Sequence, residues 1–120
     1  MNDQNPSSGE NAPLSAHDRV DAIVKGSPVV FFMKGTPNFP MCGFSARVAQ
    51  ALANIGVPYQ AVNVLADAEI REGVKAYGNW PTIPQLYVNG ELVGGCDITM
   101  ALFQSGELAT MLTEASNPAS

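Results

Sequence analysis

The segment PVVFFMKGTPNFPMCGFSARV, residues 28–48, contains a strand pattern, a loop pattern and a helix pattern in direct succession. Its first part, PVVFFMK, is a continuous β-prone run, which favours a strand covered on both faces over a half-exposed edge. The next part, GTPNFPM, holds two prolines and a glycine, so we expect a loop. From Cys42 to Asn54, apolar residues recur at steps of four, four and three, which predicts an amphipathic helix that Gly56 ends.

The same reasoning extends outward along the chain. Three further helices are predicted: one from Ser15 to Gly26, one over 67–77, and one over 97–115 that is broken near Gly106. Further strands are predicted over 57–64 and on both sides of a turn at Asn89-Gly90. The first two strands are joined by a helix and are therefore expected to be parallel, while the hairpin adds an antiparallel pair. The fold class predicted is α/β, with a mixed four-stranded sheet and helices on both faces.

Composition restricts the possible functions. The 120 residues fit one domain, and the net charge of −5 with six scattered Lys and Arg argues against a nucleic-acid partner. The longest apolar run, VVFFM, is far too short for a membrane span, so we expect a soluble protein. Two cysteines cannot form a disulfide framework, and the N-terminal segment has no signal-peptide pattern, so a cytoplasmic location is expected. Residues 1–13 and 116–120 are predicted to be disordered or flexible.

Cys42 is the candidate reactive residue. A cysteine at a helix start meets unpaired backbone N–H groups and the positive end of the helix dipole, and both favour the thiolate; Lys34 adds a positive charge nearby. Such a thiolate suits redox exchange and soft-metal binding alike, while the simpler alternative is a buried structural thiol. The position three residues on, where a dithiol enzyme carries its second cysteine, holds Ser45, whose hydroxyl cannot resolve a mixed disulfide.

The segments FFMKGTPNFPMCGFS and NWPTIPQLYVNGELVGGCDI, with Arg71 between them, closely resemble the monothiol (CGFS-type) glutaredoxins over roughly residues 15–115. The resemblance implies a thioredoxin-like fold, with the glutaredoxin domain over 14–115. It also implies that glutathione binds, and that a homodimer holds one [2Fe-2S] cluster between two active-site cysteines and two glutathione thiolates. One thiolate, that of Cys42, is too few for a cluster that generally needs about four ligands, and this arrangement supplies the remainder.

The resemblance also assigns roles to single residues. Cys42 is the cluster ligand and the candidate catalytic thiol, and the basic pair Lys34 and Arg71 holds the glycine carboxylate of glutathione. Ile83 pairs through its backbone with the cysteinyl unit of the peptide, next to a cis Pro84. The full set of predicted glutathione-binding residues is Lys34, Cys42, Phe44, Arg71, Thr82, Ile83, Pro84, Gly95, Cys96 and Asp97.

Some of these residues have simpler explanations. Asp97 is also a plausible N-cap of the last helix, where backbone N–H groups would receive the γ-glutamyl carboxylate. Phe44 and Trp80 are interpreted mainly as packing and loop-shaping residues, and His17 as a surface residue. Three roles remain open for Cys96: a buried small residue, a disulfide partner of Cys42, or a donor of a hydrogen bond through its backbone N–H.

Two functions follow. The first is a carrier of a [2Fe-2S] cluster that passes it to acceptor proteins in iron-sulfur assembly and iron homeostasis, with at most weak enzymatic activity. The alternative is a glutathione-dependent thiol-disulfide oxidoreductase that removes glutathione from proteins through a mixed disulfide on Cys42. A third hypothesis is a redox-sensing module, and the resemblance implies a BolA-type protein as its partner.

Overall fold

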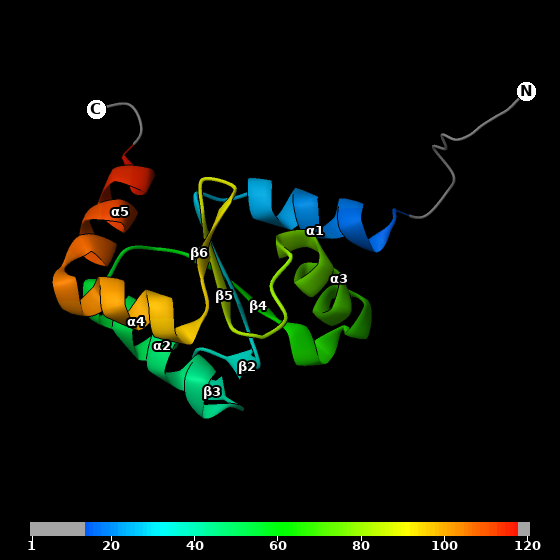
Figure 1. Ribbon diagram of the computed structural model, residues 1–120, viewed down its shortest axis with the longest axis horizontal. Coiled ribbons are helices and arrows are strands. Elements are labelled where there is room, and N and C mark those ends of the chain that lie inside the picture. The colour runs from blue at the N-terminus through cyan, green and yellow to red at the C-terminus, as the bar shows by residue number, and fades with distance from the viewer. Residues whose placement is uncertain (1–13, 118–120) are drawn as a thin grey trace, which may run out of the picture.

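The computed structural model describes residues 14–117 and consists of one mixed sheet between two layers of helices (Figure 1). The elements are α1 (Ala16–Lys25), β1 (Val29–Met33), β2 (Gly35–Thr36), β3 (Phe39–Pro40), α2 (Gly43–Ile55), β4 (Gln60–Asn63), the 3₁₀ turn η1 (Val64–Ala66), α3 (Ala68–Gly78), β5 (Gln85–Val88), β6 (Glu91–Gly94), α4 (Cys96–Ser105) and α5 (Glu107–Ser116). The tail expected at 1–13 and the last three residues lie outside the described part.

The strand order is β4-β1-β5-β6, with β1 parallel to β4 and antiparallel to β5, and β5 antiparallel to β6. This confirms the mixed four-stranded sheet and the parallel pairing of the first two strands. In Figure 1, α1 and α3 cover one face of the sheet, while α2, α4 and α5 cover the other.

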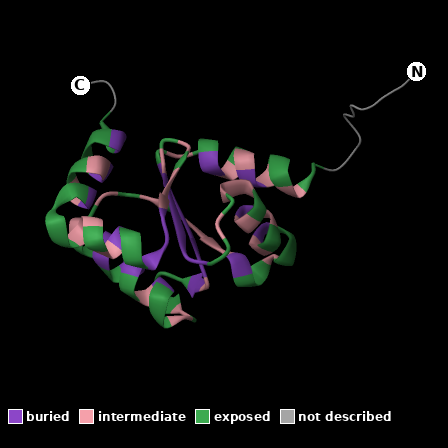
Figure 2. Cartoon of the chain, in the orientation of Figure 1, coloured by how far each residue is buried: buried purple, intermediate pink, exposed green. Residues whose placement is uncertain are grey.

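Every residue of β1 is buried, as expected for a central strand covered on both faces (Figure 2). Phe31 and its neighbours at alternate positions pack with Leu52 of α2 and Leu108 of α5. Phe32, which points the other way, packs with Val24 of α1 and Val74 of α3. The short strand thus joins two separate apolar clusters and fixes the layers around it.

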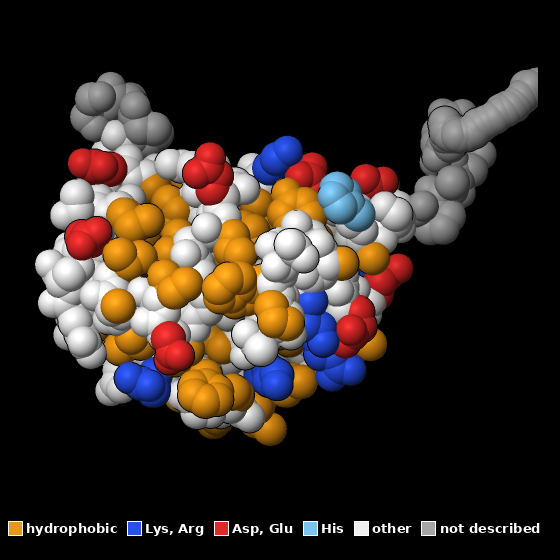
Figure 3. Space-filling view, viewed as in Figure 1, with side chains coloured by type: hydrophobic (Ala, Val, Ile, Leu, Met, Phe, Trp, Pro, Cys, Tyr) orange, Lys and Arg blue, Asp and Glu red, His pale blue; other side chains and the backbone are white. Residues whose placement is uncertain are grey.

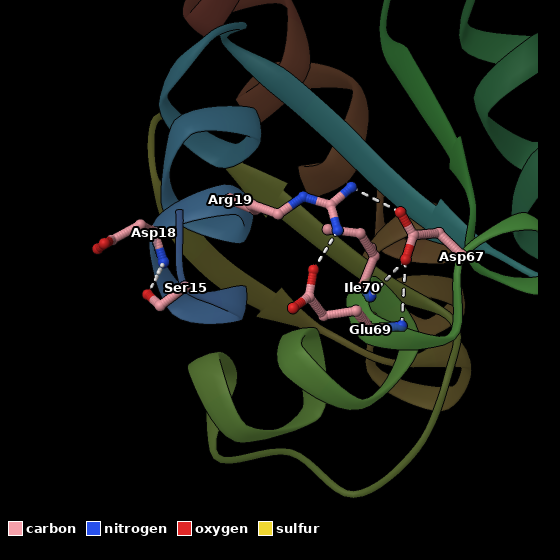
Figure 4. Close-up of polar contacts among 6 residues, drawn as sticks. All are labelled: Ser15, Asp18, Arg19, Asp67, Glu69 and Ile70. Atoms are coloured by element: carbon pink, nitrogen blue, oxygen red, sulfur yellow. Dashed lines mark hydrogen bonds and ion pairs between the residues drawn. The ribbon is translucent and has the colours of Figure 1, made fainter. Parts of the chain in front are cut away.

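An ion-pair network ties α1 to the start of α3 (Figure 4). The Arg19 guanidinium contacts a Glu69 carboxylate oxygen, and its Nη2 lies 2.6 Å from Oδ2 of Asp67. Asp67 is also the N-cap of α3, because its Oδ1 accepts hydrogen bonds from the N–H groups of Glu69 and Ile70 at 3.1 and 3.2 Å. Arg71, one of the predicted site residues, follows directly within this anchored first turn.

The segment expected to be a loop, 35–41, is instead a small hairpin formed by β2 and β3. Gly35 adopts a positive φ of 94°, and its missing side chain matters because a Cβ there would lie 2.4 Å from the Phe39 carbonyl oxygen. Thr36 Oγ1 accepts a hydrogen bond from the Phe39 N–H at 3.2 Å, and the Met41 N–H donates to the Lys34 carbonyl at 2.9 Å. The turn therefore closes through local hydrogen bonds despite its prolines.

Helix termini differ from the predicted ones at two places. Helix α3 continues through Gly78 and ends at Asn79 in the left-handed conformation, φ 50°. Gly78 is not the C-cap of the helix, but it leaves no room for a side chain, because a Cβ at this position would lie 2.4 Å from the Tyr87 hydroxyl. The expected cap at Asp97 is wrong: Gly95 is the N-cap of α4, and Asp97 lies exposed in the first turn.

Candidate functional site

A groove of about 780 Å³ brings together all ten predicted site residues, which come from five separate stretches of the chain. The loop before α2, the start of α3, the loop before β5 and the start of α4 contribute most of its wall. In Figure 3, most Lys and Arg side chains on the visible face of the molecule lie along the lower edge of the molecule, among apolar side chains. The groove therefore combines cationic and apolar surface in a protein whose net charge is −5.

Cys42 is the N-cap residue of α2, in extended conformation, and is partly exposed in the groove. A hydrogen bond from the Ser45 backbone N–H is the main factor that lowers the pKa of the Cys42 thiol below its ordinary value of 9.0. The Phe44 N–H, the Ser45 hydroxyl and the charge of Lys34 act in the same direction, while burial opposes them. The lowered pKa agrees with the expected effect of a helix N-terminus, and the partial exposure of Cys42 argues against a buried structural thiol.

Ser45 is fully buried beneath Cys42, where it also organises the loop. Its hydroxyl oxygen accepts a hydrogen bond from the Lys34 N–H at 3.1 Å, so its own proton is free to point at the sulfur. A serine at this position thus replaces a second thiol with a hydrogen-bond donor to the first. The sequence indicated the missing thiol but not this contact.

Three cationic side chains line the groove: Lys34, Arg71 and Lys75. Glu72 partly neutralises two of them, with its Oε2 3.1 Å from Lys75 Nζ and 3.7 Å from Arg71 Nε. Sequence reasoning selected Arg71 but missed Lys75, although their i,i+4 spacing places them on the same face of a helix. It also missed the apolar wall residues Leu65, Pro81 and Ile98.

The loop before β5 contains a cis Ile83–Pro84 peptide bond, as the family resemblance implied. Gln85, fully buried, holds this loop: its Nε2 donates to the carbonyl oxygens of Trp80 and Thr82, each at 3.1 Å. Its Oε1 accepts a hydrogen bond from the Tyr87 hydroxyl at 2.9 Å. A buried amide therefore fixes the backbone that forms one wall of the groove.

The N-terminus of α4 forms another wall. Its N-cap, Gly95, provides no side-chain cap, so the first backbone N–H groups of the helix are available to an anion. A Cβ at Gly95 would lie 3.0 Å from Nε1 of Trp80, so these two residues pack closely. Burial is the main factor that raises the pKa of the Cys96 thiol, in contrast to Cys42.

Two interpretations of single residues can now be judged. Phe44 is 58% exposed at the groove, so its interpretation as a packing residue is wrong: the start of α2 turns its ring away from the core. His17 is exposed on α1, which confirms a surface position, and its ring centroid lies 5.0 Å from that of Tyr77 with the rings tilted by 50°. Within residues 14–117, no three His, Cys, Asp or Glu side chains gather into a metal-binding group. No helix of that part has the length and apolar character to cross a membrane.

The sheet order, the cysteine at the start of α2 and the adjoining cis-proline loop define a thioredoxin-like protein of the glutaredoxin class. The Glutaredoxin family model matches residues 29–93. A monothiol glutaredoxin of Synechocystis sp., ycf64-like, is 57% identical over 97 residues, which cover 81% of this chain and 91% of the relative. This chain belongs to the monothiol glutaredoxin family.

Solved structures agree with this assignment. The solution structure of reduced poplar apo GrxS14 is similar with a TM-score of 0.69 and 47% identity, over 81% of this chain and 89% of the other. The crystal structure of a buckwheat glutaredoxin-glutathione complex is similar with a TM-score of 0.73 and 27% identity, over 83% of this chain and 89% of the other. The thioredoxin-like fold predicted from the sequence is thereby confirmed.

Proposed function

We propose that this chain binds glutathione in the Cys42 groove and, as a homodimer, carries a [2Fe-2S] cluster to acceptor proteins. The observation that supports this most is the pairing of Cys42, a partly exposed thiol of lowered pKa, with the buried Ser45 in place of a resolving thiol. Such a site keeps a thiolate available to a soft metal, and it has a hydroxyl at the position where a dithiol enzyme carries its resolving thiol.

The groove has the groups that a glutathione molecule needs. Glutathione carries two carboxylates, and the groove offers both side-chain cations, Lys34 and Arg71, and uncapped N–H groups at the start of α4. The backbone of Ile83 is held in the same wall and can pair with an extended peptide. The buckwheat relative, whose structure is that of a glutathione complex, has the same fold.

The donor atoms fit a shared cluster. Thiolates are the usual ligands of iron-sulfur clusters, about four for each cluster. Within this chain the lowered pKa of Cys42 favours a thiolate, whereas the raised pKa of the buried Cys96 favours the protonated thiol. One chain therefore offers one thiolate ligand, and two chains with two glutathione molecules complete the set. Because half of the ligands are exchangeable tripeptides, the cluster is suited to transfer.

Anaerobic reconstitution with iron, sulfide and glutathione tests the proposal. We expect visible thiolate-to-iron absorption that elutes with a dimer, and its loss when glutathione is omitted. Cys42→Ser should abolish the absorption, and the matched variant Cys96→Ser should retain it. A colourless monomer under these conditions would refute the carrier function.

The same groove also supports the alternative enzymatic function, because one thiolate beside a glutathione site is sufficient for it. The Cys42 thiolate would attack the glutathione sulfur of a glutathionylated protein and release the protein thiolate. A second glutathione thiolate would then attack that sulfur, yielding glutathione disulfide and regenerating Cys42. Turnover of a glutathionylated peptide, coupled to glutathione reductase and NADPH, measures this activity. Rates near background would leave the carrier function as the better account.

A further inference from the structure

A second groove, about 730 Å³ in volume, lies between the β5-β6 hairpin and α5. It shares no lining residue with the Cys42 groove. Its apolar surface includes Val93 of β6, Leu102 of α4 and Met111 of α5, all of them partly exposed. Of these, Val93 and Leu102 also pack against the apolar cluster below the sheet, so this part of the groove floor is continuous with the core. Nothing in the proposed function uses this groove.

Its charged residues are all acidic. Glu91, Glu107 and Glu114 line it and are exposed, and no Lys or Arg does so. Figure 3 shows the apolar side chains of this region with acidic ones around them and no basic one among them. All six Lys and Arg of the sequence lie elsewhere, and within residues 14–117 none forms an ion pair with these carboxylates. Lys25 and Glu91 both line a different hollow, outside this groove, and Lys25 Nζ lies 3.1 Å from Oδ1 of Asp21.

The groove also includes part of a sheet edge. Strand β6 is the last in the order β4-β1-β5-β6, so its outer backbone groups have no strand neighbour in the described residues. An exposed edge strand offers unpaired N–H and C=O groups on which an extended peptide can pair. Here apolar side chains and carboxylates lie beside that edge. The apolar side chains would select the side chains of a bound peptide, and the negative potential would orient it.

We propose that this second groove docks an extended segment of a partner protein that contains both Lys or Arg and apolar residues. Basic side chains of the segment would face Glu91, Glu107 and Glu114, and its apolar side chains would cover Val93 and Met111. Such docking leaves Cys42 and its groove uncovered, so a partner bound here still has access to the group bound at the Cys42 thiol.

Charge argues against other occupants. Residues 1–13 and 118–120 contain no Lys or Arg, so neither segment offers basic side chains to the carboxylates of the groove. Nucleic acid and anionic lipid surfaces are negatively charged and would be repelled by three carboxylates. A second copy of this chain could also offer cations, Lys25 and Arg47 among them, and the test below separates that occupant from a partner segment.

The probe is a labelled peptide, acetyl-KLKLKLK-amide, titrated into the full-length ¹⁵N-labelled protein. We expect amide shifts concentrated at residues 88–93 and 102–115, with those around Cys42 unmoved. The peptide acetyl-KSKSKSK-amide, which has the same charge without the apolar side chains, should bind more weakly. Equal affinity for the two peptides, or shifts spread over all acidic surfaces, would overturn the proposal.

Matched variants separate this groove from general attraction to an acidic protein. Met111→Lys should weaken binding about fivefold or more, since it adds a like charge and removes an apolar contact. Gln50→Lys, at an exposed position of α2, makes the same charge change elsewhere and should leave the affinity within about twofold. Equal losses in the two variants would contradict docking here. Self-association of the wild type that Met111→Lys abolishes would instead assign the groove to a second copy and overturn the proposal.

Discussion

The two cysteines line one groove but lie in opposite electrostatic environments. Hydrogen bonds at the start of α2, that from the Ser45 N–H foremost, lower the pKa of Cys42, whereas burial raises that of Cys96. Since only the thiolate reacts, we expect Cys42 in the Cys96→Ser variant to be alkylated by iodoacetamide with a pH midpoint below 9.0. Cys96 in the Cys42→Ser variant should react more slowly, with a midpoint above that value. Identical pH profiles would contradict the assigned environments.

Ser45 is predicted to act on both stability and thiol chemistry. Ser45→Ala removes a donor to the Cys42 sulfur and leaves the partly buried Lys34 N–H without its acceptor. We expect the pKa of Cys42 to rise and the free energy of unfolding to fall by about 1–3 kcal/mol. Ultraviolet thiolate titration and urea unfolding measure the two effects. Ser45→Thr keeps the hydroxyl and serves as the control for the thiol pKa; an unchanged pKa in Ser45→Ala would show that the backbone groups alone set it.

At the scale of elements, the loop from Trp80 to Pro84 depends on one buried amide. Gln85→Leu removes both hydrogen bonds to the loop, and we expect glutathione affinity to fall at least about tenfold as the wall of the groove loosens. Tyr87→Phe removes only the hydrogen bond to Gln85 Oε1 and leaves the loop contacts in place. It should cost about 1 kcal/mol of stability with little loss of affinity.

Calorimetric titration with glutathione, together with urea unfolding of each variant, separates positioning from stability. The pKa of Cys42 should be the same in both variants, because the thiol sits on α2 and not on this loop. If Tyr87→Phe loses as much affinity as Gln85→Leu, the loop is not positioned by the amide itself.

Elements with a strong local pattern were predictable from the sequence, and those that depend on distant contacts were not. The apolar run of β1 and the helical spacing after Cys42 gave the central strand and α2. The β2-β3 hairpin was missed because its prolines outweigh every strand signal, and it closes through hydrogen bonds of Lys34 and Thr36. The cap at Gly95 was missed because Asp97 has the better side chain for capping.

The candidate site shows the same division. Its ten residues could be named from motifs that match a family, and the structure places all of them in one groove. The role of Gln85 could not be predicted, because a buried amide shows no periodicity and its partners are backbone carbonyls of a folded loop. The acidic second groove is assembled from β5, β6, α4 and α5 and likewise has no signal in any single stretch.

At the scale of the whole molecule, the layer of α1 and α3 is held to the fold by Arg19 as well as by apolar packing. The hydrogen bond from Arg19 is the main factor that lowers the pKa of Asp67 below its ordinary value of 3.8. A carboxylate with a depressed pKa in the folded state stabilises that state above its unfolded pKa. This contribution is lost as the pH falls through the folded pKa. Acid should therefore weaken the α1-α3 layer first.

Arg19→Met tests this, with Lys25→Met as the control on the same helix. The Arg19 side chain is 35% exposed and bridges two elements, whereas that of Lys25 is 65% exposed and pairs within α1. We expect Arg19→Met to lower the free energy of unfolding near neutral pH and to make its decline below about pH 4 shallower, since the pKa of Asp67 is then less depressed and only the Ile70 and Glu69 N–H groups still lower it. Lys25→Met should have a smaller effect, because exposed helix pairs contribute little. Urea unfolding from about pH 2 to pH 7 gives both quantities. If the two variants lose the same stability at every pH, apolar packing alone holds the layer and the ion pairs at its edge are incidental.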